Sequence, residues 1–111
     1  MTEEERRTAM TIALSDALEY QPLLQGAPQT CGMRAGRVAL APSERCGQHS
    51  TNAHEETLVF LSGSGVAHVE GAGALPVGEG VVAYIPPHTK HDIEAGPEGL
   101  RYVYVVSPAG G

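Results

Sequence analysis

The sequence predicts an antiparallel all-β domain folded as a sandwich or barrel, and two observations support this prediction. The first is composition: 14 Gly and 8 Pro are spread along 111 residues, which is typical of short strands joined by tight turns. The second is a series of short apolar segments, separated by turn residues, that begins after Gly26. Strands this short cannot bury a core in one flat sheet, so a jelly-roll barrel of about eight strands fits the chain.

Each predicted strand is an apolar segment bounded by residues that favour turns. Glycine and proline supply the backbone angles that turns require, and they stand at Gly71 to Gly73, Gly78 to Gly80 and Pro86-Pro87. Residues 62–65 and 96–97 have the same composition and are also predicted to be turns. The predicted strands are 33–40, 57–61, 65–69, 81–85 and 101–106.

Residues 1–32 lack this regular pattern. We predict that they form an N-terminal segment, partly strand and partly irregular, which packs on a barrel of residues 33–111. Ile12 and Leu14 alternate as in a strand, whereas residues 16–20 also fit one turn of helix.

Charge and hydropathy argue against two classes of partner. Seven Lys and Arg against thirteen Asp and Glu give a net charge of −6, so most of the surface repels a phosphate backbone, and no nucleic acid partner is expected. The longest apolar runs are far shorter than the roughly 20 residues of a membrane span, so no membrane partner is expected. Without a recognisable signal peptide, we expect a cytoplasmic protein in which Cys31 and Cys46 are free thiols.

The histidines indicate a metal site. All five fall between His49 and His91, and two stand in a polar segment with paired glutamates. Imidazole and carboxylate ligands suit Fe, Mn, Ni or Zn, and two histidines with one carboxylate leave coordination positions open. Side chains two apart on a strand share a face, so His54 and Glu56 point the same way. One divalent metal ion is therefore predicted, with the candidate ligands His49, His54, Glu56 and His91.

The polar segment resembles the first motif of the cupin superfamily, written Gly-x5-His-x-His-x3-4-Glu-x6-Gly. His49 and Glu56 stand at ligand positions, and Gly63 closes the motif. Thr51 stands where the motif has its second histidine, so one of the family's four usual ligands is missing. That coordination position is open to His54, Thr51 or water.

A later segment resembles the second cupin motif, Gly-x5-Pro-x4-His-x3-Asn. Gly80, Pro86 and His91 follow its spacing, whereas Ala95 replaces the final asparagine, which is not a ligand in the family. Ser43 also replaces the opening glycine of the first motif. Two motifs in the right order imply a small, single-domain, RmlC-like cupin over about residues 33–106.

The resemblance leaves several functions open. One hypothesis is a metal-dependent dioxygenase or isomerase acting on a small oxygen-bearing molecule, with Glu55 or His54 transferring a proton. A second is a non-catalytic barrel that binds or senses a small acid or sugar, and a third is a barrel that holds no metal. The resemblance also implies a homodimer, to which residues 10–25 are expected to contribute.

Overall fold

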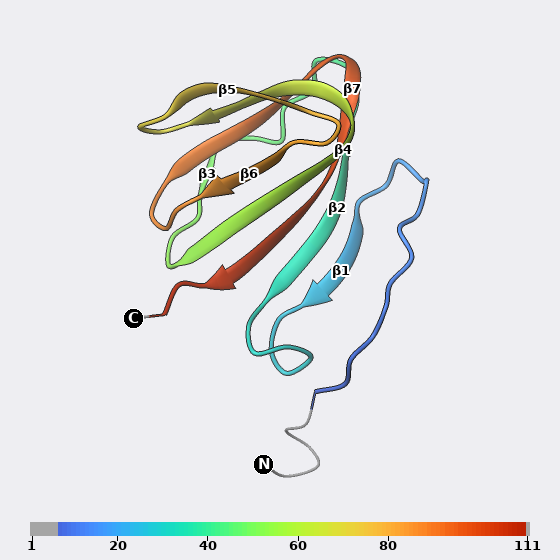
Figure 1. The fold of residues 1–111 in the computed structure, drawn as a ribbon, viewed down its shortest axis with the longest axis vertical. Helices are drawn as coiled ribbons and strands as arrows, with labels where there is room; N and C mark the ends of the chain where they lie inside the picture. Colours follow the sequence, from blue (N-terminus) through green and yellow to red (C-terminus); the bar gives the residue numbers. More distant parts are fainter. Residues whose placement is uncertain (1–6, 111) are drawn as a thin grey trace.

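The computed structural model describes residues 7–110, so the first six residues of the predicted N-terminal segment lie outside it. Every regular element between those bounds is a strand, and all pairings are antiparallel (Figure 1), which confirms the predicted fold class. None of these residues form a helix long and apolar enough to cross a membrane. The strands are β1 Gln21–Gln25, β2 Arg34–Leu40, β3 His49–Ser50, β4 His54–Val69, β5 Gly73–Gly78, β6 Val82–Ile85 and β7 Lys90–Pro108.

The long strands β4 and β7 pair along almost their whole length and link two layers. The sheet order is β1-β2-β7-β4-β5, with β3 paired to β7 and β6 paired to β4. The first half of β4 and the second half of β7 therefore share one layer with β1, β2 and β6. Their other halves share the second layer with β3 and β5 (Figure 1).

The predicted turns at residues 62–65 and 96–97 are wrong, because both segments lie inside the long strands β4 and β7. The pairing of these strands is irregular there. A Cβ atom at Gly63, whose φ is +85°, would lie 2.1 Å from the carbonyl oxygen of Gly99. Only glycine permits this approach. The glycines let the paired strands bend from one layer into the other without ending.

The apolar core lies between the two layers. Phe60 and Tyr102 form an aromatic pair with ring centroids 5.2 Å apart, and both are almost fully buried. Burial of such side chains is the main favourable contribution to folding. The remaining core residues are Leu40, Leu58, Ala67, Val69, Val77, Ile85, Ile93, Ala95 and Leu100.

The described part of the N-terminal segment before β1 is irregular, with neither a strand nor a helical turn. Two arginines on the outer face of the sheet hold it. Arg37 Nη2 donates a hydrogen bond to the Ala17 carbonyl oxygen at 2.8 Å, and Arg101 Nη2 donates to the same oxygen at 2.9 Å. Residues 7–20 therefore run beside β1 and β2, outside the barrel (Figure 1).

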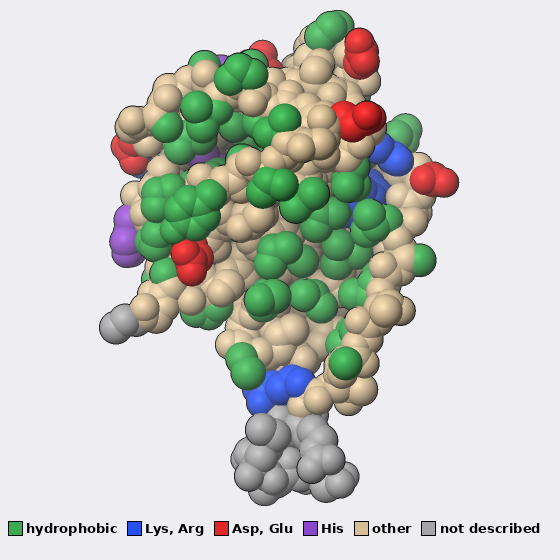
Figure 2. Space-filling view, viewed as in Figure 1, with side chains coloured by type: hydrophobic (Ala, Val, Ile, Leu, Met, Phe, Trp, Pro, Cys, Tyr) green, Lys and Arg blue, Asp and Glu red, His purple; other side chains and the backbone are tan. Residues whose placement is uncertain are grey.

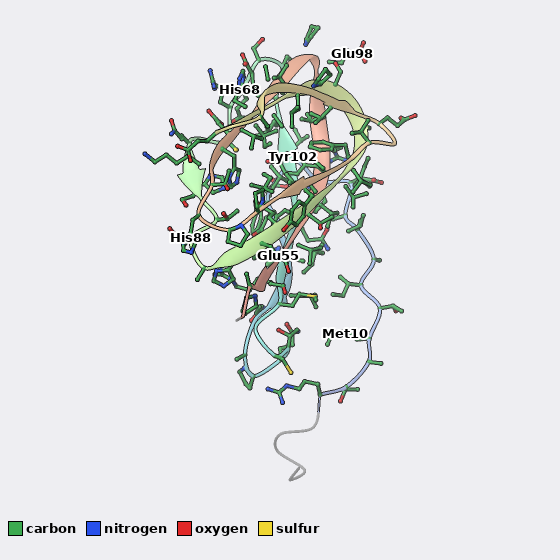
Figure 3. The ribbon with its side chains drawn as sticks, turned by 60° about the vertical axis from the view of Figure 1, so that its left-hand side comes forward. Met10, Glu55, His68, His88, Glu98 and Tyr102 are labelled. Atoms are coloured by element: carbon green, nitrogen blue, oxygen red, sulfur yellow. The ribbon has the colours of Figure 1, made fainter. Side chains whose placement is uncertain are left out.

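The outer face of the sheet carries exposed apolar side chains over β4 and β6 (Figure 2). Val59 and Val82 are cross-strand partners, and both are exposed, as is Tyr84. Met10 on the N-terminal segment is also exposed, away from the barrel (Figure 3). The expected homodimer stays a prediction.

Candidate metal site

The site begins with two histidines that face each other across a strand pair. His49 on β3 and His91 on β7 are direct partners, with ring centroids 4.1 Å apart. Glu56 enters from the first half of β4, in the opposite layer. The ligand atoms of these three side chains lie within 4.8 Å of one another, so residues far apart in the sequence converge inside the barrel.

Both histidines are oriented in the same way. His49 Nδ1 lies 2.9 Å from the Gly47 carbonyl oxygen, and His91 Nδ1 lies 3.1 Å from the Thr89 carbonyl oxygen. Because a carbonyl oxygen only accepts hydrogen bonds, each Nδ1 carries the proton. Each neutral ring then keeps a lone pair on Nε2, and a backbone carbonyl that fixes the ring in this way is typical around metal ligands.

The contact between Glu56 and His91 also fits a metal site. Glu56 Oε1 lies 3.0 Å from His91 Nε2, and the two side chains are only 7% and 1% exposed. The contact is an ion pair if His91 is protonated, but among the described residues it is not a well-aligned hydrogen bond. Buried polar atoms are normally satisfied. A cation between the nitrogen and the carboxylate would satisfy both.

The electrostatics of His91 reflect the same contact. Burial alone lowers its pKa, but the Glu56 carboxylate, the Thr89 carbonyl and the negative charge of Asp92 outweigh burial and raise the pKa overall. His91 therefore stands in a negative environment that favours a cation, whether a proton or a metal ion.

Thr51, at the position of the missing motif histidine, has a structural role. Its hydroxyl donates a hydrogen bond to the Pro86 carbonyl oxygen at 2.7 Å and accepts one from the Thr89 backbone nitrogen at 3.1 Å. This hydroxyl ties the segment after His49 to the turn before His91. His54 lines the same cavity as the three candidate ligands but is not part of their cluster.

Comparison with known proteins decides the family. Residues 36–106 match the model of the cupin domain. The chain belongs to the cupin family. No curated protein matches this chain.

Solved cupin structures confirm the fold of this cupin. A cupin protein from Bacteroides fragilis has a TM-score of 0.72 at 20% identity, with 100% of this chain and 89% of that chain covered. A cupin 2 conserved barrel protein from Salinispora arenicola has a TM-score of 0.71 at 23% identity, with 92% of each chain covered. The Cnp3 cupin domain of Schizosaccharomyces pombe has a TM-score of 0.72 at 18% identity, with 88% of this chain and 69% of that chain covered.

Asp92 connects the candidate site of this cupin to the loop before β3. Its Oδ2 atom accepts a hydrogen bond from Arg45 Nε at 2.8 Å, and its Oδ1 atom accepts one from the Gly47 backbone nitrogen at 3.0 Å. Burial raises the pKa of Asp92, but the hydrogen bonds from Arg45, Cys46 and Gly47 lower it overall. Since the Gly47 carbonyl orients the His49 ring, Asp92 helps to position a candidate ligand. The motif comparison did not identify this role.

Cys46 lies between this loop and the cavity. It is free, as is Cys31, which agrees with the prediction. Its Sγ atom accepts a hydrogen bond from the Ile93 backbone nitrogen at 3.3 Å. Burial, the largest of several effects, raises the pKa of Cys46, so it remains a thiol at neutral pH. The side chain lines the cavity without being activated as a nucleophile.

A cavity of about 520 Å³ opens beside the three candidate ligands, large enough for a small organic molecule. Tyr102 and Tyr104 line it, and Figure 3 shows Tyr102 inside the barrel. Burial is the first cause that raises the pKa of each tyrosine, so both hydroxyls stay protonated. The Tyr104 hydroxyl also hydrogen-bonds to the hydroxyl of Tyr20. The aliphatic lining comprises Val38, Ala53, Leu58, Ile93 and Val106.

Two further side chains differ from the motif-based expectations. Glu55, considered for proton transfer, does not line the cavity: its Oε1 atom accepts a hydrogen bond from the exposed Tyr84 hydroxyl at 2.9 Å. Arg34 lines the cavity, although no motif includes it. The alternation of side chains along β2 and β4 accounts for both positions.

Proposed function

We propose that this cupin binds one divalent ion of Fe, Mn, Ni or Zn through His49, Glu56 and His91 and uses it to transform a small oxygen-bearing molecule. The reaction is that of a dioxygenase or an isomerase. The observation that carries the proposal is the convergence of His49, Glu56 and His91, whose ligand atoms lie within 4.8 Å of one another, with His91 Nε2 3.0 Å from the Glu56 carboxylate. A proton shared by His91 and Glu56 would also stabilise this contact, but only a metal ion would use the lone pair of His49 as well.

The three side chains suit a catalytic ion better than a structural one. Structural metal sites use four protein ligands, whereas three ligands leave positions open for a substrate. A bound divalent ion would supply Lewis acidity, polarising a carbonyl or carboxylate oxygen of the substrate. The backbone carbonyls of Gly47 and Thr89 keep the two imidazoles oriented for this role.

The cavity residues supply binding and proton transfer. The apolar walls exclude water from the substrate, and the protonated hydroxyl of Tyr102 can donate a hydrogen bond, whereas the hydroxyl of Tyr104 is already bonded to that of Tyr20. His54 lines the cavity outside the ligand cluster, and an imidazole can take up or release a proton near neutral pH. His54 is therefore the proposed proton-transfer residue, in place of Glu55.

A second candidate function is a non-catalytic barrel in which the metal anchors a small ligand. The protonation states of three side chains in the cavity favour this second function. Cys46, Tyr102 and Tyr104 all have raised pKa values, so they serve better as hydrogen-bond donors than as bases. In that case His54 is a contact residue only. Both functions require the metal site, but only the first predicts that the bound molecule is converted to a product.

Metal loading followed by a turnover assay tests the proposal. The parent is titrated with Mn²⁺ and Fe²⁺ beside His91→Ala, with His68→Ala as the control, because His68 contacts Glu94 outside the cluster. We expect the parent and the control to bind one ion and His91→Ala to bind none. Loaded protein is then mixed with small keto acids and diketones, and oxygen uptake and proton exchange in D2O are measured. Binding of these molecules without either signal would favour the non-catalytic function.

A further inference from the structure

Arg34 and Glu56 lie in one row across the inner face of the sheet. Both pair with Val106 of β7, Arg34 from β2 and Glu56 from β4. All three side chains line the cavity. Two strand spacings place the backbones of Arg34 and Glu56 roughly 10 Å apart. The cavity therefore has a carboxylate of the candidate metal site on one side and a guanidinium on the other.

The guanidinium of Arg34 is available for a ligand. Within residues 7–110 it forms no hydrogen bond or ion pair. Its aliphatic stem passes over Gly26, where an added Cβ would lie 3.2 Å from Arg34 Cγ. By contrast, Arg37 on the opposite face of β2 is buried and donates hydrogen bonds to backbone carbonyls. Arg34 is exposed, at the solvent side of the cavity.

The charged side chains that line the cavity indicate what charge a bound ligand should carry. Glu56 is the one acidic side chain among the described residues that line it, and Arg34 is the one arginine or lysine. Because these two charges cancel, a divalent ion bound at the cluster leaves about two positive charges in a partly apolar space. A ligand with two negative charges neutralises them.

We propose that the ligand of this cavity is a small organic dicarboxylate, with one carboxylate directed to the metal site and the other held by Arg34. The inference rests on the proposed function, because it needs the bound ion. Arginine suits this role because its planar guanidinium can donate two parallel hydrogen bonds to a carboxylate. The apolar floor formed by Val106 contacts the carbon chain between the two carboxylates.

Calorimetric titration of Mn²⁺-loaded protein with straight-chain acids tests the proposal. The ligands are malonate, succinate, glutarate and adipate, with propionate, butyrate, pentanoate and hexanoate as their monocarboxylate matches. The variants are Arg34→Gln, which removes the positive charge, and Arg34→Lys, which keeps the charge but cannot donate two parallel hydrogen bonds to one carboxylate. Lys90→Gln is the control, because it removes one positive charge from a side chain that does not line this cavity.

We expect one dicarboxylate to bind the parent at least about tenfold more tightly than its monocarboxylate match. Arg34→Gln should lose about tenfold of that affinity, Arg34→Lys should lose less, and Lys90→Gln should lose none, with Mn²⁺ affinity the same in all four proteins. Equal binding of the two acid classes, or equal losses in Arg34→Gln and Lys90→Gln, would overturn the inference while leaving the metal site intact. Failure of the parent to take up Mn²⁺ would overturn the proposed function and this inference together.

Discussion

Strands β2, β7 and β4 carry two rows of side chains on their inner face, one tightly packed and the other lining a cavity. One row is packed: Phe60 and Tyr102 are 1% and 3% exposed, with ring centroids 5.2 Å apart. The other row lies farther along the same strands, where Arg34, Val106 and Glu56 line an open cavity. Phe60 pairs with Tyr102 and Glu56 pairs with Val106 in the same strand pair, so the chemical character of the side chains largely distinguishes the core row from the site row.

This difference separates stability from binding. Apolar side chains fill the space between the layers because close packing is favourable. Charged side chains cannot be packed that way without losing their hydration, so the space beside them stays open unless a ligand or ion compensates. Substitution of Phe60, which does not line the cavity, should therefore change folding, and substitutions at the open end should change binding.

Phe60→Ala should have the largest effect. Removing a buried aromatic ring lowers the free energy of unfolding by about 3 to 5 kcal/mol. Phe60→Leu keeps most of the volume and should cost less. Urea denaturation measures both, and metal bound per folded chain should match the parent in the leucine variant. A loss below about 1 kcal/mol for the alanine variant would contradict the assignment of this row to the core.

Glu56→Gln should have the next largest effect, on metal affinity. The amide keeps the shape of the side chain but loses the charge that a divalent ion requires, so affinity should fall at least about a hundredfold. The metal-free protein should still fold, because the amide keeps the shape of the carboxylate, and its free energy of unfolding should fall by at most about 1 to 3 kcal/mol for the lost contact with His91. Glu55→Gln is the matched control and should bind metal normally. Equal losses in both variants would show a general charge effect.

Thr51→Val should lower stability and leave metal stoichiometry unchanged. Valine preserves the shape but leaves the Pro86 carbonyl and the Thr89 amide without the hydroxyl, at a cost of about 1 to 3 kcal/mol. Thermal denaturation of the metal-free protein measures the cost, and metal analysis measures stoichiometry. Loss of the metal from a folded Thr51→Val protein would instead identify the hydroxyl as a ligand.

His54→Ala should have the smallest effect on metal affinity, a change of less than about threefold, because His54 lies outside the ligand cluster. Calorimetric titration with Mn²⁺ measures the change. If the proposed function holds, proton exchange in a bound substrate should fall in the same variant. A large loss of metal affinity would mean that His54 completes the coordination shell.

The sequence indicated which side chains would converge more accurately than it indicated the strand boundaries, whereas their role as metal ligands stays a prediction. His49, His54, Glu56 and His91 were the predicted ligands, and the structure brings His49, Glu56 and His91 together but leaves His54 outside the cluster. Arg34 was missed because no motif includes it: its place in the same row as Glu56, across β7, depends on two strand pairings that only the structure shows. The role of Asp92 was missed because Asp92 positions His49 only indirectly, through its hydrogen bond with the Gly47 backbone nitrogen.

The errors in the fold have a common physical cause. Glycine marks any backbone conformation that other residues avoid, whether a turn or a bend inside a strand. At Gly63 the bend occurs where β4 passes close to β7, and a sequence pattern does not distinguish the two cases. β5 was not predicted because Gly73–Gly78 contains Gly, Ala and Pro and only one β-branched residue.

The most direct test of the central claim, that His49, Glu56 and His91 together hold one divalent ion, is anomalous X-ray diffraction from crystals grown with Zn²⁺. The account predicts one strong anomalous peak per chain, within about 2.3 Å of a nitrogen of each histidine and of a Glu56 carboxylate oxygen. The same crystals of His91→Ala should lack it. Absence of a peak at this position in the parent, or peaks confined to surface histidines such as His68 or His88, would contradict the claim.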